Sequence, residues 1–170
     1  DAGDFASSVA LWGRARTDWT KLLGTADAET AFALAMGPDR ALYVGGYASS
    51  MLDGEAYSGG TDALVTKYMS DGSKAWTRLL GTAGDDSAWA LATGLDGALY
   101  VSGTTNGPLD GLTQHGNSDA FIVKYAADGN RLWSRLLGTG DADRAYGLAA
   151  AADGAIYVVG ETEGTLDGQD

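Results

Sequence analysis

The stretch WTRLLGTAGDDSAWALATGLDGALYVSG, residues 76–103, decides the fold because most of it occurs three times in the chain. Trp19, Trp76 and Trp133 are 57 residues apart and open the phrases WTKLLGT, WTRLLGT and WSRLLGT. The match continues without an insertion through further shared positions: Tyr43, Tyr100 and Tyr157, then Gly46, Gly103 and Gly160, then an LDG triplet in each copy. Three copies in one register predict a repeat architecture, in which each copy is one structural unit.

Within one copy the residue pattern is that of short β-strands. In SAWALAT (87–93) small alanines alternate with Trp89 and Leu91, as a strand with two differently packed faces requires. ALYVSG (98–103), DAFIVKY (119–125) and RLWSRLLG (131–138) are three more strand-like segments, and Asp-Gly turns separate the segments. Four short antiparallel strands in each 57-residue copy predict a blade of a β-propeller.

The order of these motifs resembles the bacterial β-propeller repeat called SBBP. W-T-x-LLGT is followed by GDD-x-A-x-ALA, DG-x-LYV-x-G-x-T, LDG and SDAF-x-x-KY-x-x-DG, and the similarity covers residues 19–170. The resemblance implies an all-β propeller of four-stranded antiparallel blades in a secreted or cell-surface bacterial protein, and it implies little chemistry. Before Trp19 the segment DFASSVALWGRARTD departs from the pattern, since the lysine-tyrosine pair is missing.

The two ends of the chain are expected to complement each other. We expect one propeller half-domain over residues 1–170, circularly permuted, with blade repeats that start at Trp19, Trp76 and Trp133. Residues 133–170 open a blade, and residues 1–18 supply the strand that completes it. Joining the two ends places Trp12 14 residues after Gly168, the same separation as from Gly111 to Tyr125.

Three blade equivalents are too few for a closed propeller, because known propellers have about four to eight blades. The sequence therefore predicts a homo-oligomer: a dimer that forms a six-bladed ring, or a filament built by strand addition. A fragment of a longer propeller is the third alternative.

Composition excludes several classes of partner. The chain of 170 residues carries a formal net charge of -12, which repels nucleic acid and anionic lipid surfaces. No apolar run approaches the roughly 18 residues of a membrane span, so no membrane insertion is expected. The chain starts at Asp1, which fits a processed export signal as well as a trimmed chain. We expect an acidic extracellular or cell-surface protein.

In each copy a pair of acidic residues lies between the LLGT phrase and the alanine-rich segment that follows it. Calcium takes oxygen ligands, so one interpretation is a calcium site in each repeat. The other interpretation, which we favour, is that these acids accept hydrogen bonds from backbone N–H groups and cap the turn. No known calcium-loop pattern is present, and calcium is the only cofactor that the sequence suggests. The candidate ligands are Asp27, Glu29, Asp85, Asp86, Asp141 and Asp143.

No catalytic residue is predicted. His115 is the only histidine and lies in the segment QHGNSD, where no serine and acid have the spacing of a nucleophilic triad, so we expect it on an exposed loop. A glycoside hydrolase is the least favoured alternative, because a catalytic acid should break the repeat symmetry and no acid does so.

The aromatic residues leave two functions open. The repeated tryptophans and tyrosines are predicted to pack between blades, and Phe32, Trp89 and Tyr146 to form a core site that tolerates different shapes. Lys67 and Lys124 are predicted to mark outer strands. The favoured function is a non-catalytic, self-assembling structural protein. The alternative is a lectin-like module that binds a glycan through aromatic faces.

Overall fold

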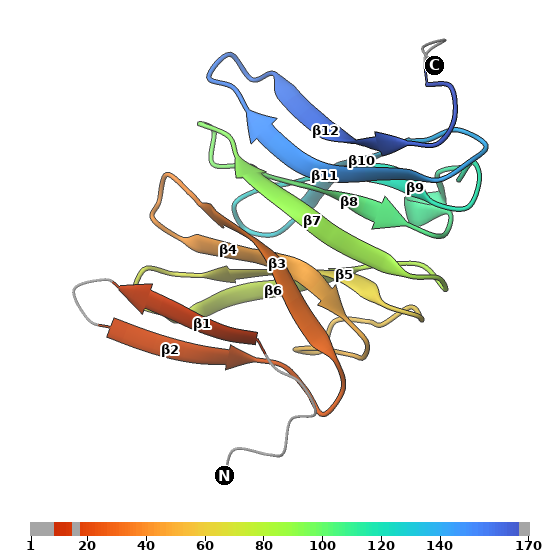
Figure 1. The fold of residues 1–170 in the computed structure, drawn as a ribbon. Coiled ribbons are helices and arrows are strands. Elements are labelled where there is room, and N and C mark those ends of the chain that lie inside the picture. Colours follow the sequence, from red (N-terminus) through yellow and green to blue (C-terminus); the bar gives the residue numbers. More distant parts are fainter. Residues whose placement is uncertain (1–8, 15–17, 167–170) are drawn as a thin grey trace.

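Short antiparallel strands make up almost all of the regular structure in the computed structural model, which describes residues 9–14 and 18–166 (Figure 1). This confirms the predicted all-β fold. The one helix in these ranges is the three-residue 3₁₀ turn η1 (Leu109–Gly111), and none there could serve as a membrane-spanning helix. The strands are β1 (Val9–Arg14), β2 (Asp18–Leu23), β3 (Glu29–Met36), β4 (Leu42–Ala48), β5 (Asp62–Tyr68), β6 (Lys74–Leu80), β7 (Asp86–Thr93), β8 (Leu99–Thr105), β9 (Asp119–Tyr125), β10 (Arg131–Leu137), β11 (Asp143–Ala150) and β12 (Ile156–Thr162).

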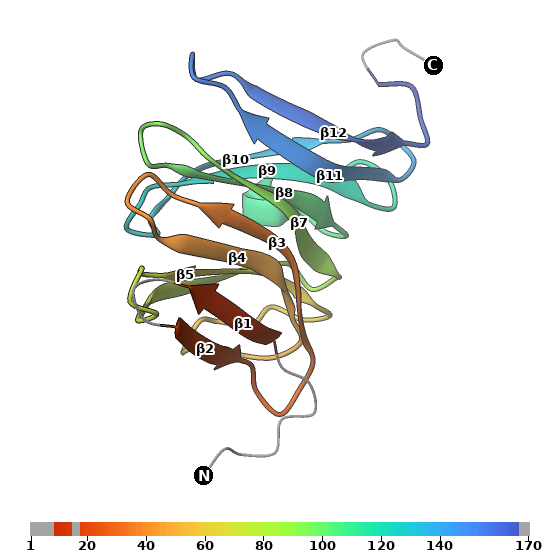
Figure 2. The same cartoon turned by 60° about the vertical axis from the view of Figure 1, so that its left-hand side comes forward.

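The strands form two four-stranded and two two-stranded antiparallel sheets. Strands β3 to β6 make one four-stranded sheet and β7 to β10 the other, in chain order. The expected four-stranded antiparallel sheets are thus confirmed. Strands β1 and β2 pair only with each other, as do β11 and β12. These two pairs lie at opposite ends of the stack of sheets (Figures 1 and 2).

A β-bulge at the same repeat position kinks the first strand of three sheets. In β3 the register shifts between Ala31 and Ala33, and the equivalent shifts occur in β7 and β11. Opposite the bulge lies Gly46, where a Cβ atom would come within 1.8 Å of the Thr30 carbonyl oxygen. The same close approach exists at Gly103 and Gly160. The bulge therefore explains why this glycine repeats.

The main core lies between the two four-stranded sheets. Tyr43 and Val65 from one sheet and Val101 and Phe121 from the other are almost fully buried in one cluster. Each such side chain contributes roughly 1.5–3 kcal/mol when removed from water. A second cluster holds Leu23 of β2 together with residues of β4 and β5, so the β1–β2 pair packs on the face of the first four-stranded sheet.

Candidate functional site

Three of the candidate calcium ligands cap a turn. Asp86 Oδ2 and Asp143 Oδ2 each accept the backbone N–H of the threonine four residues earlier at 2.6 Å, and Glu29 Oε2 accepts that of Thr25 at 2.9 Å. The threonine hydroxyls donate to the same carboxylates. The capping interpretation is thus confirmed for Glu29, Asp86 and Asp143. It also explains the threonine that ends each LLGT phrase.

The other three candidate ligands lie on the same turns in different roles. The backbone N–H groups of Asp27 and Asp141 donate to threonine hydroxyls at 3.0 and 3.2 Å. Asp85 Oδ1 accepts the hydroxyl of Thr61 from the preceding sheet at 3.4 Å. Across the described residues, no three acidic, histidine or cysteine side chains gather in a way that could hold a metal ion.

Two buried carboxyl groups lie where the two four-stranded sheets meet. Asp62 and Asp86 are 0% exposed, and Oδ1 of each has no hydrogen-bond partner. The backbone N–H of Asp86 donates to the Thr61 carbonyl at 2.7 Å and joins the sheets. Burial raises the pKa of both carboxyls, and the charge of Asp62 raises that of Asp86 further. Asp62 was not predicted from the sequence, although the repeated Asp-Ala at 62–63 and 119–120 was a signal for it.

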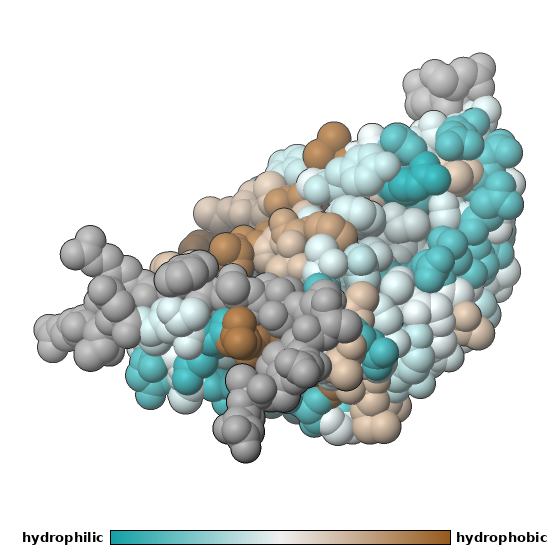
Figure 3. Space-filling model, turned by 60° about the horizontal axis from the view of Figure 1, so that its bottom comes forward, coloured by the Kyte–Doolittle hydropathy of each residue, from teal (hydrophilic) through white to brown (hydrophobic). Residues whose placement is uncertain are grey.

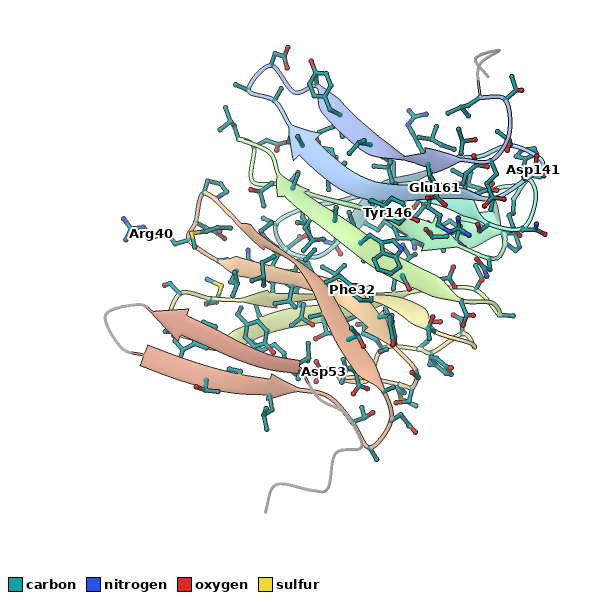
Figure 4. The ribbon with its side chains drawn as sticks, in the orientation of Figure 1. Phe32, Arg40, Asp53, Asp141, Tyr146 and Glu161 are labelled. Atoms are coloured by element: carbon teal, nitrogen blue, oxygen red, sulfur yellow. The ribbon has the colours of Figure 1, made fainter. Side chains whose placement is uncertain are left out.

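Three aromatic side chains form a row across β3, β7 and β11. The ring centroids of Phe32 and Trp89 are 4.2 Å apart in a stack, and those of Trp89 and Tyr146 are 6.1 Å apart edge to face. Phe32 is 40% exposed and Tyr146 45%, so the predicted core site is wrong for these two. The bulge falls at all three aromatic residues. Trp89 stays half-buried because it lies between the rings of Phe32 and Tyr146, which are at the two ends of the row. Figure 4 shows Phe32 and Tyr146 on strands to either side of β7.

Trp76 packs between the sheets, as predicted. Its ring lies 5.8 Å from that of Tyr43 and 6.3 Å from that of Tyr125 in the next sheet. Its indole Nε1 donates to the Ala127 carbonyl at 3.2 Å. Trp19 stacks in the same manner on Tyr68, at 6.0 Å.

The expectation that Lys67 marks an outer strand is wrong. Strand β5 lies between β4 and β6, and Lys67 is only 5% exposed. Its Nζ donates to Asp39 Oδ2 at 2.8 Å and to the Ala127 carbonyl of the next sheet at 3.0 Å. Burial alone would lower the pKa of Lys67, but hydrogen bonds to Asp39 and Tyr43 raise it. Lys124 likewise lies on an inner strand, β9, where its Nζ contacts Asp96. A buried ammonium group is tolerated because it is paired.

Two cavities occur at equivalent repeat positions along β6 and β10. The cavity of about 520 Å³ is lined by Trp76, Asp53 and Lys74, together with Asp128 of the neighbouring sheet. The cavity of about 270 Å³ beside Trp133 is lined only by residues of its own sheet. Their charged groups are already paired, because Asp53 binds Lys74 and Asp110 binds Arg131, both at 2.5 Å.

His115 is exposed, as predicted for a loop histidine. Its backbone N–H donates to Asp119 Oδ2 at 2.9 Å. This backbone hydrogen bond fixes the loop to the start of β9.

Equivalent residues are buried in the middle of the molecule and exposed at its ends. Tyr43 is 1% exposed and Tyr100 6%, whereas Tyr157 on β12 is 63% exposed. Leu91 is 8% exposed because it packs on Gly45 of the preceding sheet, whereas Leu34 on β3 is 62% exposed. Figure 3, seen from the side of β1 and β2, shows apolar residues at the surface. At both ends the described residues therefore leave part of a sheet face uncovered.

The fold and its open ends define the class of the molecule, an all-β repeat protein of antiparallel sheets. No protein-family model matches the chain, so the resemblance to SBBP repeats stays a prediction. The chain is similar to Regulatory protein FlaEY of Caulobacter vibrioides, with 29% identity over 125 residues. The match covers 69% of this chain and 13% of FlaEY, so the chain spans only a small part of that protein.

Proposed function

We propose that the protein is a non-catalytic structural component that self-associates as part of a β-propeller. Each four-stranded sheet serves as one blade, and the β1–β2 and β11–β12 pairs serve as two halves of a shared blade. The observation that carries the proposal is the contrast at matched repeat positions: Tyr157 and Leu34 are exposed, although Tyr43 and Leu91 are buried at the same places in the repeat.

The unpaired strand edges at the two ends are complementary. Strands β4 and β8 each pair with a third strand, β5 and β9, whereas β12 has no third strand among the described residues. Strand β1 pairs with β2 as β5 pairs with β6, but its other edge has no partner in the same ranges. Pairing β12 of one copy with β1 of a second copy satisfies both edges.

The apolar faces at the two ends support the same joint. Leu91 packs on Gly45, and the residues at these repeat positions at the two ends are Leu34 and Val159, which are 62% and 68% exposed. Bringing the ends of two copies together places Leu34 of one copy against Val159 of the other. Two such joints close a six-bladed ring with twofold symmetry.

The solution mass of the 170-residue chain tests this proposal. Sedimentation velocity should give the mass of two chains, and Val159→Arg or Leu34→Arg should give one, because a charge would be buried at the joint. Leu95→Arg is the matched control, since Leu95 is 78% exposed on a turn away from both ends. A wild-type chain that stays monomeric at millimolar concentration contradicts the proposal. A mass that grows steadily with concentration would replace the ring by a filament.

The resemblance to SBBP repeats supports this role. FlaEY is described as a regulatory protein, and the match covers only 13% of it, so it assigns no role to this chain. The SBBP resemblance supports a secreted or cell-surface location, and appearance of the protein in the culture medium or on intact cells would test it.

Carbohydrate binding is a second candidate, favoured by the exposed aromatic row. Phe32 and Tyr146 present partly exposed rings at the two ends of the row. Trp89 is covered by Phe32 at 4.2 Å, so a sugar could stack only at the ends of the row. Calorimetric titration with oligosaccharides, with Tyr146→Ala as the binding-deficient variant, distinguishes this role from assembly.

A further inference from the structure

Trp76 and Arg78 on β6 hold the tip of the β9–β10 hairpin of the next sheet, and we call this pair the β6 socket. The indole Nε1 donates to the Ala127 carbonyl at 3.2 Å, and Arg78 Nε donates to the Gly129 carbonyl at 2.9 Å. The Arg78 guanidinium lies 5.6 Å from the centre of the Trp76 ring. A Cβ atom on Gly129 would come within 2.9 Å of that ring, so the tip of this hairpin lies directly against the indole.

The same pair of side chains recurs on β10, and we call Trp133 and Arg135 the β10 socket. The Arg135 guanidinium lies 5.5 Å from the centre of the Trp133 ring. Tyr100 lies 6.1 Å from Trp133, as Tyr43 lies 5.8 Å from Trp76. The β10 socket therefore has the geometry of the β6 socket before any hairpin enters it.

The β10 socket differs from the β6 socket in what fills it. Arg78 is half-buried and bonded to the hairpin, whereas Arg135 is exposed. The side chains of Trp133 and Arg135 contact each other, but neither donates a hydrogen bond to a residue in the described ranges 9–14 and 18–166. Beside Trp133 lies the 270 Å³ cavity, which receives no residue from another sheet. Two oriented donors and an aromatic face thus lack the backbone carbonyls that they bind at the equivalent site.

The occupant that fits is the outer strand pair of another blade, because that is what the β6 socket holds. The described residues form three such pairs: β1–β2, β5–β6 and β9–β10. The tip of β5–β6 already lies against Trp19, since a Cβ on Gly72 would come within 2.8 Å of that ring. The tip of β9–β10 fills the β6 socket, so the β1–β2 pair is the remaining one.

We propose that Trp133 and Arg135 bind the β1–β2 strand pair of a second copy of this chain, which completes the sheet that β11 and β12 begin. This inference rests on the proposed self-association and names the residues that recognise the partner. The bound pair would contact two chains at once, since Trp19 of β2 also stacks on Tyr68 of its own chain at 6.0 Å. Each chain gives one strand pair and offers one socket, so the exchange is reciprocal.

The test measures the dimer dissociation constant of the full chain by sedimentation equilibrium. Arg135→Met should weaken the dimer by about tenfold or more, because it removes a charged donor from a backbone carbonyl. Trp133→Leu should weaken it similarly. Arg144→Met on β11 is the control, since it removes another arginine that is only paired with Glu161 and Glu163, and it should change the constant less than about threefold. Circular dichroism checks the fold, and Arg135→Met, at an exposed position, keeps the test decisive should Trp133→Leu not fold.

Hydrogen exchange supplies a second readout on β12. In the wild-type dimer the β12 amides should exchange more slowly as concentration rises, and Arg135→Met should shift this dependence to about tenfold higher concentration. If both socket variants leave the dissociation constant unchanged while Val159→Arg still gives a monomer, the chain self-associates without the socket, and this inference is wrong although the proposed function stands. A monomeric wild-type chain overturns both.

Discussion

The junction between the two four-stranded sheets and the two ends of the molecule are built from the same repeat positions. At the junction Tyr43, Leu91 and Val65 are buried, and Lys67 reaches across to the Ala127 carbonyl. At the ends Tyr157 and Leu34 face solvent. Burial of a given position in a repeat protein therefore depends on whether a neighbouring unit is present, because one unit cannot cover its own apolar face.

The largest difference in unfolding free energy between the two regions should come from substituting the repeated tyrosine. Tyr43→Ala should lower the free energy of unfolding by about 3–5 kcal/mol, because it leaves a cavity in the core. Tyr157→Ala should change it by less than about 0.5 kcal/mol in a single chain. Urea unfolding measures both variants, with Val159→Arg present throughout to keep the chain monomeric. Equal losses for the two tyrosines would show that position 157 is covered within one chain.

A second prediction concerns the glycine opposite the bulge. Gly46→Ala should destabilise the protein by about 1–3 kcal/mol, because the new Cβ would lie 1.8 Å from the Thr30 carbonyl oxygen and the bulge must shift. Gly140→Ala is the matched control, since a Cβ atom there would have nothing within 4 Å and the φ of Gly140 is not positive. It should be neutral or stabilise by up to about 1 kcal/mol. Thermal unfolding compares them, and a neutral Gly46→Ala would contradict the structural need for glycine there.

The two repeated lysines should also differ in how much they stabilise the protein. Lys67→Met should cost about 1.5–3 kcal/mol, because the ammonium group binds both Asp39 and the carbonyl of the neighbouring sheet. Lys124→Met should cost less than about 1 kcal/mol, since its ammonium group contacts Asp96 and the Tyr100 ring, both in its own sheet. Urea unfolding of both variants is the measurement. A larger loss for Lys124 would mean that the contact between sheets adds nothing.

The smallest effect is expected from the buried carboxyl groups at the junction, and it depends on pH. The pKa of Asp62 is raised by burial, so its contribution to stability is fully present below the unfolded value of 3.8 and is lost as pH rises through the folded pKa. Asp62→Asn should therefore stabilise the protein at pH 7 by about 1 kcal/mol, and it should have little effect at pH 3. Asn retains an acceptor for the Ser58 N–H. Unfolding measured from pH 3 to 7 tests the sign, and a loss of stability at pH 7 would show that the carboxylate is needed in its charged form.

The repeat pattern was sufficient to predict strands β7 to β10, because period-two alternation and Asp-Gly turns are local signals. The capping by Asp86 and Asp143 was also predictable, since acceptor and donor are only four residues apart. The bulge was not, because it depends on which residue of β8 faces each residue of β7. The exposure of Phe32 and Tyr146 and the burial of Lys67 follow from such pairings and from the next sheet.

Local sequence patterns were enough to predict an all-β protein of repeated units, with apolar positions at a fixed spacing and acidic residues in its turns. These are properties of segments a few residues long, copied three times. The packing of the sheets against one another sets which copies of a position are buried. It also explains why Trp76 holds a hairpin while Trp133 holds none among the described residues. The physical reason is that identical side chains lose water only where another sheet lies against them, and a one-dimensional repeat leaves its first and last members without that neighbour.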